Sequence, residues 1–132
     1  MRYLIDTTVL VPHFAGDPTA ATILQRLESD GIAVSILAYL EAYQGVIEHP
    51  EPSAIRVEFD AFFRAVPVLP VSLAVARRCA QLRALLKRQG KSPRRRAFDL
   101  VIAATALEHG LELVTHNTRD YRDIPDLVLY RF

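Results

Sequence analysis

The sequence predicts an α/β fold: a three-layer α/β/α sandwich with a central, mostly parallel sheet of four or five strands. Three observations lead to this prediction. Short apolar runs alternate with longer segments in which apolar residues recur at helical spacing. The connections between the apolar runs contain the crossover helices that parallel strands require. Polar and acidic residues directly follow apolar runs, as expected at the carboxyl edge of an open parallel sheet, where ligands bind.

Length and composition predict a single domain spanning residues 1–132 with a sizeable core. The 16 lysines and arginines nearly balance the 15 aspartates and glutamates, so the net charge of +1 does not by itself predict a nucleic-acid partner. The only cysteine, Cys79, excludes an intramolecular disulfide and fits a reducing cytoplasm. No signal peptide is visible, and no apolar run is long enough to span a membrane. We therefore expect a cytoplasmic protein.

The first half of the chain is expected to hold two strands and three helices. The strands are residues 2–6 and 32–36, and the helices are residues 18–30, 37–48 and 53–65. Asp17 and Pro18 suit the N-cap and the first position of the first helix, and Gly31 ends it. The apolar residues 9–14 include Pro12, which we interpret as a break.

The second half of the chain is expected to hold two helices and up to three strands. The helices run from Ser72 to Gln89 and from about Phe98 to Gly110, and the strands are residues 66–71, 111–115 and 126–132. Pro67 and Pro70 remove two ladder donors, so the first of these strands should be short or lie at the sheet edge. Residues 91–96 form a basic loop that leads into the helix of Asp99.

Three carboxylates occupy strand ends or the starts of helices. Asp6 follows the first strand, Glu41 follows the second, and Asp99 lies in the first turn of its helix. If the strands are parallel neighbours, these acids meet at one edge, where they need a positive charge nearby. Oxygen ligands suit Mg²⁺ or Mn²⁺, which activates water for attack on a phosphodiester.

Each acid also has a plain structural interpretation. Asp99 is favoured at a helix start by the helix dipole, and Glu41 fits a solvated helix surface. Asp6 is harder to explain in this way, because an acid at the end of a buried strand is uncommon.

Two segments together with Glu41 form a more specific pattern. They are LIDTTVL (Leu4–Leu10) and FDLVIAATALEHGLELVTHNTRDY (Phe98–Tyr121). The second segment combines an Asp, an alanine-rich helix, a Gly turn and a strand that ends in T-x-N-x-x-D. Over nearly its whole length the chain resembles PIN-domain ribonucleases, specifically the VapC toxins of bacterial VapBC toxin–antitoxin modules.

The resemblance implies a set of metal-binding residues. Asp6, Glu41 and Asp99 match the family's core acids, which hold Mg²⁺ or Mn²⁺. The fourth position, often Asp in the family, is Asn117 here, and its amide carbonyl adds no charge. Asp120 is a candidate for the missing carboxylate, directly or through water.

Hydroxyl side chains flank these acids in the sequence. Thr7 and Thr115 match small hydroxyl positions that hold the carboxylates or the attacking water. Thr8 stands where the family commonly has Asn or Ser, and its hydroxyl is suited to orient Asp6. The resemblance thus implies a supporting role for all three threonines.

One dense basic patch precedes Asp99. It consists of Lys87, Arg88, Lys91, Arg94, Arg95 and Arg96. We interpret Arg94, Arg95 and Arg96 either as a rim that contacts RNA phosphates or as an ordinary solvated loop. Lys87 and Arg88 are better explained by the C-terminal end of the helix dipole.

The resemblance implies a divalent-metal-dependent endoribonuclease, the toxin of a type II toxin–antitoxin system, that cleaves tRNA or rRNA to 5′-phosphate and 3′-hydroxyl ends. It also implies a homodimer, higher assemblies with a VapB-like antitoxin, and no membrane partner.

A PIN-like RNA- or protein-binding module without catalysis is the alternative, suggested by Asn117. A phosphoryl-receiving domain is disfavoured because no second acid closely follows Asp6, and a haloacid-dehalogenase phosphatase because Thr8 replaces the second acid of D-x-D.

Overall fold

A sheet of four parallel strands forms the middle of the molecule. The computed structural model describes residues 1–132. The strands are β1 (Tyr3–Ile5), β2 (Ile32–Ser35), β3 (Val68–Leu69) and β4 (Glu112–Val114), in the spatial order β3-β2-β1-β4. Leu4 of β1 pairs with Ala33 on one side and with Leu113 on the other. The predicted α/β class and parallel sheet are confirmed, and β1 lies in the sheet interior.

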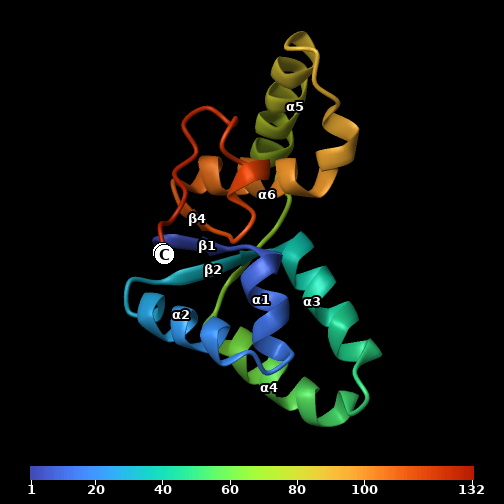
Figure 1. Cartoon of the computed structure of the whole chain (residues 1–132), viewed down its shortest axis with the longest axis vertical. Helices are drawn as coiled ribbons and strands as arrows, with labels where there is room; N and C mark the ends of the chain where they lie inside the picture. Colours follow the sequence, from blue (N-terminus) through green and yellow to red (C-terminus); the bar gives the residue numbers. More distant parts are fainter.

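Six α-helices cover the two faces of this sheet (Figure 1). They are α1 (Thr7–Phe14), α2 (Pro18–Glu28), α3 (Ile36–Glu48), α4 (Pro52–Ala65), α5 (Leu73–Arg88) and α6 (Ala97–His109). Two short 3₁₀ helices are η1 (Pro93–Arg96) and η2 (Thr118–Asp120). Helices α5 and α6 lie on one side of the sheet, and α1, α2 and α4 lie on the other, as the three-layer prediction required (Figure 1).

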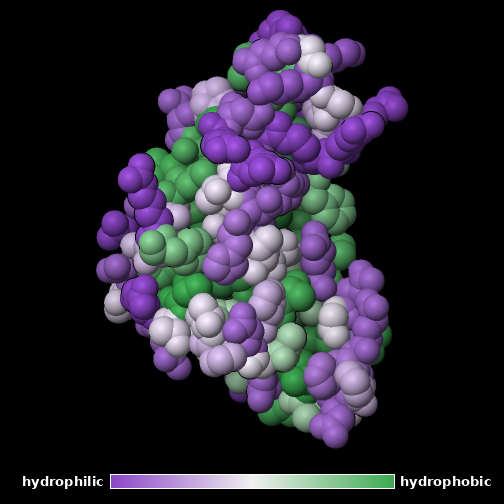
Figure 2. Space-filling view, in the orientation of Figure 1, coloured by the Kyte–Doolittle hydropathy of each residue, from purple (hydrophilic) through white to green (hydrophobic).

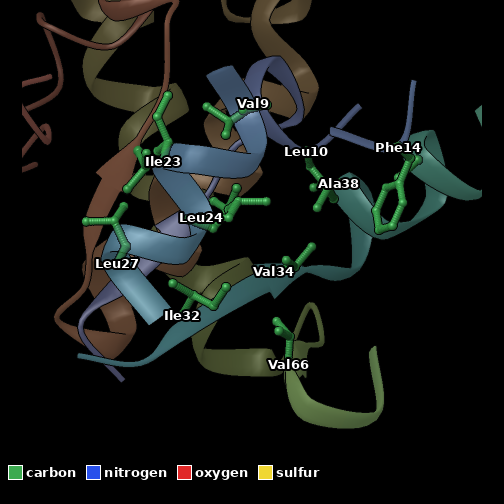
Figure 3. Close-up of a cluster of buried hydrophobic side chains, with 14 of the residues drawn as sticks. Val9, Leu10, Phe14, Ile23, Leu24, Leu27, Ile32, Val34, Ala38 and Val66 are labelled. Atoms are coloured by element: carbon green, nitrogen blue, oxygen red, sulfur yellow. The ribbon is translucent and has the colours of Figure 1, made fainter. Parts of the chain in front are cut away.

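The two faces of the sheet bury separate cores because successive strand residues point to opposite sides. Tyr3 and Ile5 of β1 join the core beneath α1 to α4, whereas Leu4 joins the core beneath α5 and α6. Figure 3 shows the first core, with side chains of α2 directed at Ile32 and Val34 of β2. Because both cores reach the sheet's carboxyl edge, the side chains there rest on packed layers on either side.

Helix α1 was not predicted. The sequence analysis placed a break at Pro12 and no helix over residues 9–14, whereas the structure has a helix through this segment. Pro12 lies inside the helix, two residues before its end, so few backbone hydrogen bonds are disturbed. Val9, Leu10 and Phe14 are buried in the first core. Each such side chain contributes about 1.5–3 kcal/mol, which together outweighs the roughly 3 kcal/mol that proline costs within a helix.

The remaining strands are shorter than expected. The strand predicted over residues 66–71 narrows to β3, at the sheet edge, as its two prolines favour. The last strand, predicted over residues 126–132, is reduced to a single bridge between Leu113 and Leu129. Asp126, the first residue of the predicted strand, has φ +65°, a left-handed conformation that interrupts extended backbone at that position.

Candidate active site

Three adjacent strands end in polar side chains at one edge of the sheet. Asp6 follows β1, Ser35 ends β2 and Thr115 follows β4. The Ser35 hydroxyl accepts hydrogen bonds from the backbone N–H groups of Leu37 and Ala38, so it caps α3. Asp6 and Thr115 instead bond to each other, with Thr115 Oγ1 donating to the Asp6 carboxylate.

Asp6 occupies the N-cap position of α1, yet its side chain accepts no backbone N–H from that helix. It is 2% exposed and instead accepts hydrogen bonds from three hydroxyl groups. Thr8 Oγ1 and Thr115 Oγ1 donate to Asp6 Oδ2 at 3.0 and 2.7 Å, and the Tyr121 hydroxyl donates to Oδ1 at 3.3 Å. Thr7 Oγ1 lies at the limit, 3.5 Å from Oδ1. A buried carboxylate is thus fixed by neutral donors alone.

Thr8 and Thr115 also lock the loop after β4 onto the start of α1. Their hydroxyl oxygens are 3.2 Å apart. The backbone N–H of His116 donates to Thr8 Oγ1 at 3.0 Å, and that of Asn117 donates to Thr115 Oγ1 at 2.9 Å. The supporting role that the sequence implies for these two threonines agrees with this geometry.

Asp99 lies beside Asp6, in the first turn of α6. Its Oδ1 accepts a hydrogen bond of 3.1 Å from the Tyr121 hydroxyl. Burial raises the pKa of Asp99, and the charges of Asp6 and Asp120 raise it further, against the opposing effects of the Tyr121 hydrogen bond and Arg96. Asp99 therefore carries its charge at a free-energy cost.

Glu41 faces the same space from α3. Burial raises the pKa of its half-buried carboxyl group, and the charges of Asp6 and Asp99 add to this effect. Asp6, Glu41 and Asp99 therefore act on one another electrostatically, as carboxylates gathered at one edge do. No three His, Cys, Asp or Glu side chains lie close enough to enclose a metal ion. The oxygen donors and the uncompensated negative charge nevertheless fit a divalent cation such as Mg²⁺.

Asn117 and Asp120 lie together on the rim of this site. The Asn117 amide Nδ2 donates to Asp120 Oδ2. Neither side chain is hydrogen bonded to Asp6, but the charge of Asp120 raises the pKa of Asp99. The charge of Asp120 thus acts on Asp99, and Asn117 holds the Asp120 carboxylate by a hydrogen bond.

The comparisons with known proteins agree with this geometry. The family model described as PIN domain matches residues 3–127. The chain belongs to the PIN-domain family.

Relatives of this PIN domain are VapC ribonucleases. Ribonuclease VapC19 of Mycobacterium tuberculosis (strain CDC 1551 / Oshkosh) is 38% identical over 128 residues, covering 94% of this chain and 95% of the relative. The tRNA(fMet)-specific endonuclease VapC of Shigella flexneri is 26% identical over 127 residues, covering 96% and 95%. The VapC resemblance inferred from the sequence motifs is confirmed.

Solved structures share the fold of this PIN domain. VapBC-1 from nontypeable Haemophilus influenzae matches with a TM-score of 0.80 at 25% identity, over 98% of this chain and 97% of that one. VapBC2 from Rickettsia felis, bound to a DNA fragment from its promoter, matches with a TM-score of 0.83 at 24% identity, over 100% and 99%. Within this chain, none of the helices has the length and apolar character needed to cross a membrane.

Arg96, one of the three arginines of the predicted RNA-contacting rim, forms a salt bridge within this PIN domain. Its Nη1 and Nη2 donate to Asp123 Oδ2 and Oδ1 at 2.9 and 2.8 Å, and Nη2 also donates to the Asp120 carbonyl. Lys91 Nζ donates to the same carboxylate at 2.8 Å. Arg96 therefore joins the segment before Asp99 to the segment after η2, and its contact with RNA stays a prediction.

Arg94 and Arg95 are exposed and form no salt bridge. The surface around η1 and the end of α5 is hydrophilic, drawn in purple in the upper part of Figure 2. These two arginines remain candidates for phosphate contacts.

Tyr121 is the site residue that sequence reasoning missed. It is 1% exposed, and its hydroxyl is the one group that bonds to both Asp6 and Asp99. Burial and these two carboxylates raise the pKa of Tyr121, so it stays a neutral donor. The available signal was a tyrosine directly after T-x-N-x-x-D, which the resemblance treated only as the end of the motif.

Proposed function

We propose that this PIN domain is an endoribonuclease that requires a divalent metal ion, and the toxin of a type II toxin–antitoxin system. The main observation is the buried carboxylate of Asp6, which lies at the N-cap position of α1 but accepts no hydrogen bond from that helix. It lies instead at the edge of the sheet where its charge acts on Asp99 and Glu41. Relatives named as VapC ribonucleases support the same activity. The substrate is RNA, in the tRNA or rRNA class.

Asp6, Asp99 and Glu41 would hold Mg²⁺ or Mn²⁺, with Asp120 or Asn117 as an additional oxygen donor. The bound cation supplies a Lewis acid that lowers the pKa of water and offsets charge on a phosphoryl group. Burial raises the pKa values of Asp99 and Glu41, and repulsion among the acids raises them further; this supports the assignment, because a cation relieves the repulsion.

The chain's own residues orient the reacting groups. Thr8, Thr115 and Tyr121 hold Asp6 in one orientation, so no rearrangement of this carboxylate is needed when substrate arrives. Arg94 and Arg95 attract the phosphate backbone of RNA toward the acids. We expect products with 5′-phosphate and 3′-hydroxyl ends.

The proposal includes a VapB-like antitoxin and a homodimer in the cytoplasm. Relatives of the same fold at 25–27% identity are toxin–antitoxin complexes, among them VapBC-1 and a complex from Klebsiella pneumoniae. Helix α3 exposes Ile36, Leu40 and Ile47, which suits a protein interface. A basic antitoxin side chain would neutralise the acids in place of metal. We also propose that residues 1–132 form one domain.

Cleavage of total bacterial RNA by the purified protein tests this function. We expect discrete fragments with Mn²⁺ and none with EDTA. Asp99→Asn should lower the cleavage rate by roughly 100-fold or more. Asp60→Asn is the matched control, because Asp60 is an exposed acid of α4 paired with Arg56. Equal cleavage by the Asp99→Asn and wild-type proteins would rule out this assignment of the site.

Asn117 favours a second candidate, a PIN module that binds RNA without cleaving it, because an amide at this position adds no negative charge. That candidate predicts RNA binding that survives EDTA and no cleavage at any Mn²⁺ concentration, after removal of any co-purified partner. A gel-shift measurement alongside the cleavage assay separates the two functions.

A further inference from the structure

A second cavity lies between α2 and the loop after β4. Its volume is about 400 Å³, within the range of sites for small molecules. It is lined by Thr19, Thr22, Ile23, Arg26, His116 and Phe132. No carboxylate lines it, and the exposed Arg26 forms no salt bridge. The cavity therefore offers an unpaired cation beside an apolar wall.

Hydrogen bonds connect this cavity to the acidic site. The backbone N–H of His116 donates to Thr8 Oγ1 at 3.0 Å, and Thr8 Oγ1 donates to Asp6 Oδ2 at 3.0 Å. His116 also directly follows Thr115, whose hydroxyl donates to the same Asp6 oxygen. One residue of the cavity lining is therefore two hydrogen bonds away from the carboxylate of Asp6.

The aromatic wall of the cavity is held rigidly. The rings of His116 and Phe132 are stacked, with centroids 4.6 Å apart and 16° between their planes. Phe132 meets Tyr130 edge to face at 5.3 Å, and Tyr130 meets the buried Tyr3 at 5.5 Å. Phe132 nevertheless remains 54% exposed. An exposed aromatic ring supported from the core is a suitable platform for stacking.

We propose that this cavity is a subsite for one unpaired nucleotide of the RNA substrate, next to the nucleotide whose phosphodiester is cut. This inference rests on the proposed function. The base lies against Phe132 and His116, Arg26 binds a phosphate or a base edge, and the Thr19 hydroxyl adds a polar contact. Proteins that recognise single-stranded RNA combine aromatic stacking with cationic side chains in this way.

Charge favours RNA over a peptide as the occupant. A cavity that anchors a protein segment is usually a desolvated apolar pocket, whereas four of the six residues here are polar or cationic. The hydrogen-bond chain from His116 through Thr8 to Asp6 also favours an occupant that reaches the acidic site. An antitoxin segment is the competing occupant, and loss of antitoxin binding without loss of RNA affinity would identify it.

Binding measured without metal tests the subsite. Fluorescence anisotropy of labelled single-stranded RNA is recorded in EDTA with Asp99→Asn protein, so that no cleavage occurs. Adding Phe132→Ala or Arg26→Gln should weaken binding roughly 10-fold, the scale of losing one stacked base or one cationic contact. Phe132→Leu, which keeps apolar volume without a π face, should weaken it similarly. Arg77→Gln, an equal charge change on the exposed surface of α5, is the matched control.

An abasic nucleotide locates the contact. RNA oligonucleotides with an abasic site at successive positions should show one position where the affinity of the Asp99→Asn parent falls and where adding Phe132→Ala has no further effect. Thermal unfolding confirms that each variant is folded. If all variants bind RNA within twofold of the Asp99→Asn parent, the subsite is wrong, whether or not the wild type cleaves RNA. The same conclusion follows if the variants lose antitoxin binding but retain full RNA affinity.

The two proposals can fail separately. If the wild type cleaves RNA and the cavity variants bind RNA normally, the proposed nuclease function is supported and the proposed subsite is wrong. If the wild type never cleaves RNA but the variants bind it weakly, the proposed nuclease function is wrong, and the cavity is still supported as a nucleotide-binding site.

Discussion

The hydroxyl of Tyr121 donates a hydrogen bond of 3.1 Å to Oδ1 of Asp99. The same hydroxyl lies 3.3 Å from Oδ1 of Asp6, so one neutral group connects two acids from different layers of the fold. In the absence of metal it offsets part of the repulsion between them. It also fixes the direction of both carboxylates.

Tyr121→Phe should keep the ring packing and lose this connection. We expect a 10- to 100-fold weaker affinity for Mn²⁺ or a similar loss of cleavage rate, as for other groups that orient metal ligands. Isothermal titration with Mn²⁺ measures the affinity independently of activity. Tyr43→Phe is the control, because the Tyr43 ring packs against Phe59 and its hydroxyl forms no hydrogen bond with another protein group. Equal Mn²⁺ affinities for the two variants would show that the Tyr121 hydroxyl does not position the acids.

Because of Glu41, the metal-free protein should be more stable at mildly acidic pH than at neutral pH. Its pKa is raised above the ordinary 4.5 by burial, then by Asp6 and Asp99. The stability from its protonated form is fully present below pH 4.5 and is lost as pH rises through the raised pKa. In EDTA, the unfolding temperature at neutral pH should therefore be higher for Glu41→Gln than for the wild type. The difference should shrink as pH falls toward 4.5, and a constant difference would contradict the repulsion.

Asp123 should have the opposite pH dependence. Hydrogen bonds from Arg96, and then from Lys91, lower the pKa of Asp123 to about 2 from an ordinary 3.8. The stability that this carboxylate contributes is present above pH 3.8 and is lost as pH falls toward 2. Allowing for solvent screening, Asp123→Asn should cost about 1–2 kcal/mol of unfolding free energy at pH 7. Urea unfolding at pH 7 and pH 3 measures it, and the difference between the two proteins should be smaller at pH 3 than at pH 7.

Arg94 and Arg95 should contribute to RNA binding and not to the stability of the fold. Replacing each with Ala should weaken RNA binding and lower the slope of log affinity against log salt by about 1 per contact. The unfolding free energy should stay within about 0.5 kcal/mol, because both side chains are exposed. Arg96→Ala is the contrasting variant, since removing the partner of Asp123 should destabilise the fold. An unchanged salt slope for Arg94→Ala and Arg95→Ala would exclude them from the RNA-binding surface.

The sequence was most informative where local chemistry decides structure. Apolar runs bounded by glycines and caps located β1, β2, β4 and the long helices, and strand-end acids indicated the edge where Asp6 and Asp99 meet. Helix α1 was missed because tertiary burial of Val9 and Leu10 overrides the local cost of Pro12.

Long-range contacts explain the other differences. Tyr121 is 115 residues from Asp6 in the sequence and 22 from Asp99, and no periodicity links such positions. Arg96 looked like its neighbours Arg94 and Arg95, and only the fold brings it to Asp123. Roles that depend on which way a side chain turns were therefore not predictable from spacing.

The three acids come from three layers of the sandwich: Asp6 from the end of a central strand, Glu41 from α3 on one side, and Asp99 from α6 on the other. A cation held by all three would join these layers directly, in addition to their packing and the hydrogen bonds of Tyr121. Its binding energy adds to the cohesion of the molecule, so metal should raise resistance to unfolding. By the same linkage, we expect substitutions that repack either core, at Phe59 or at Cys79, to shift the spacing of the three acids and so to change metal affinity.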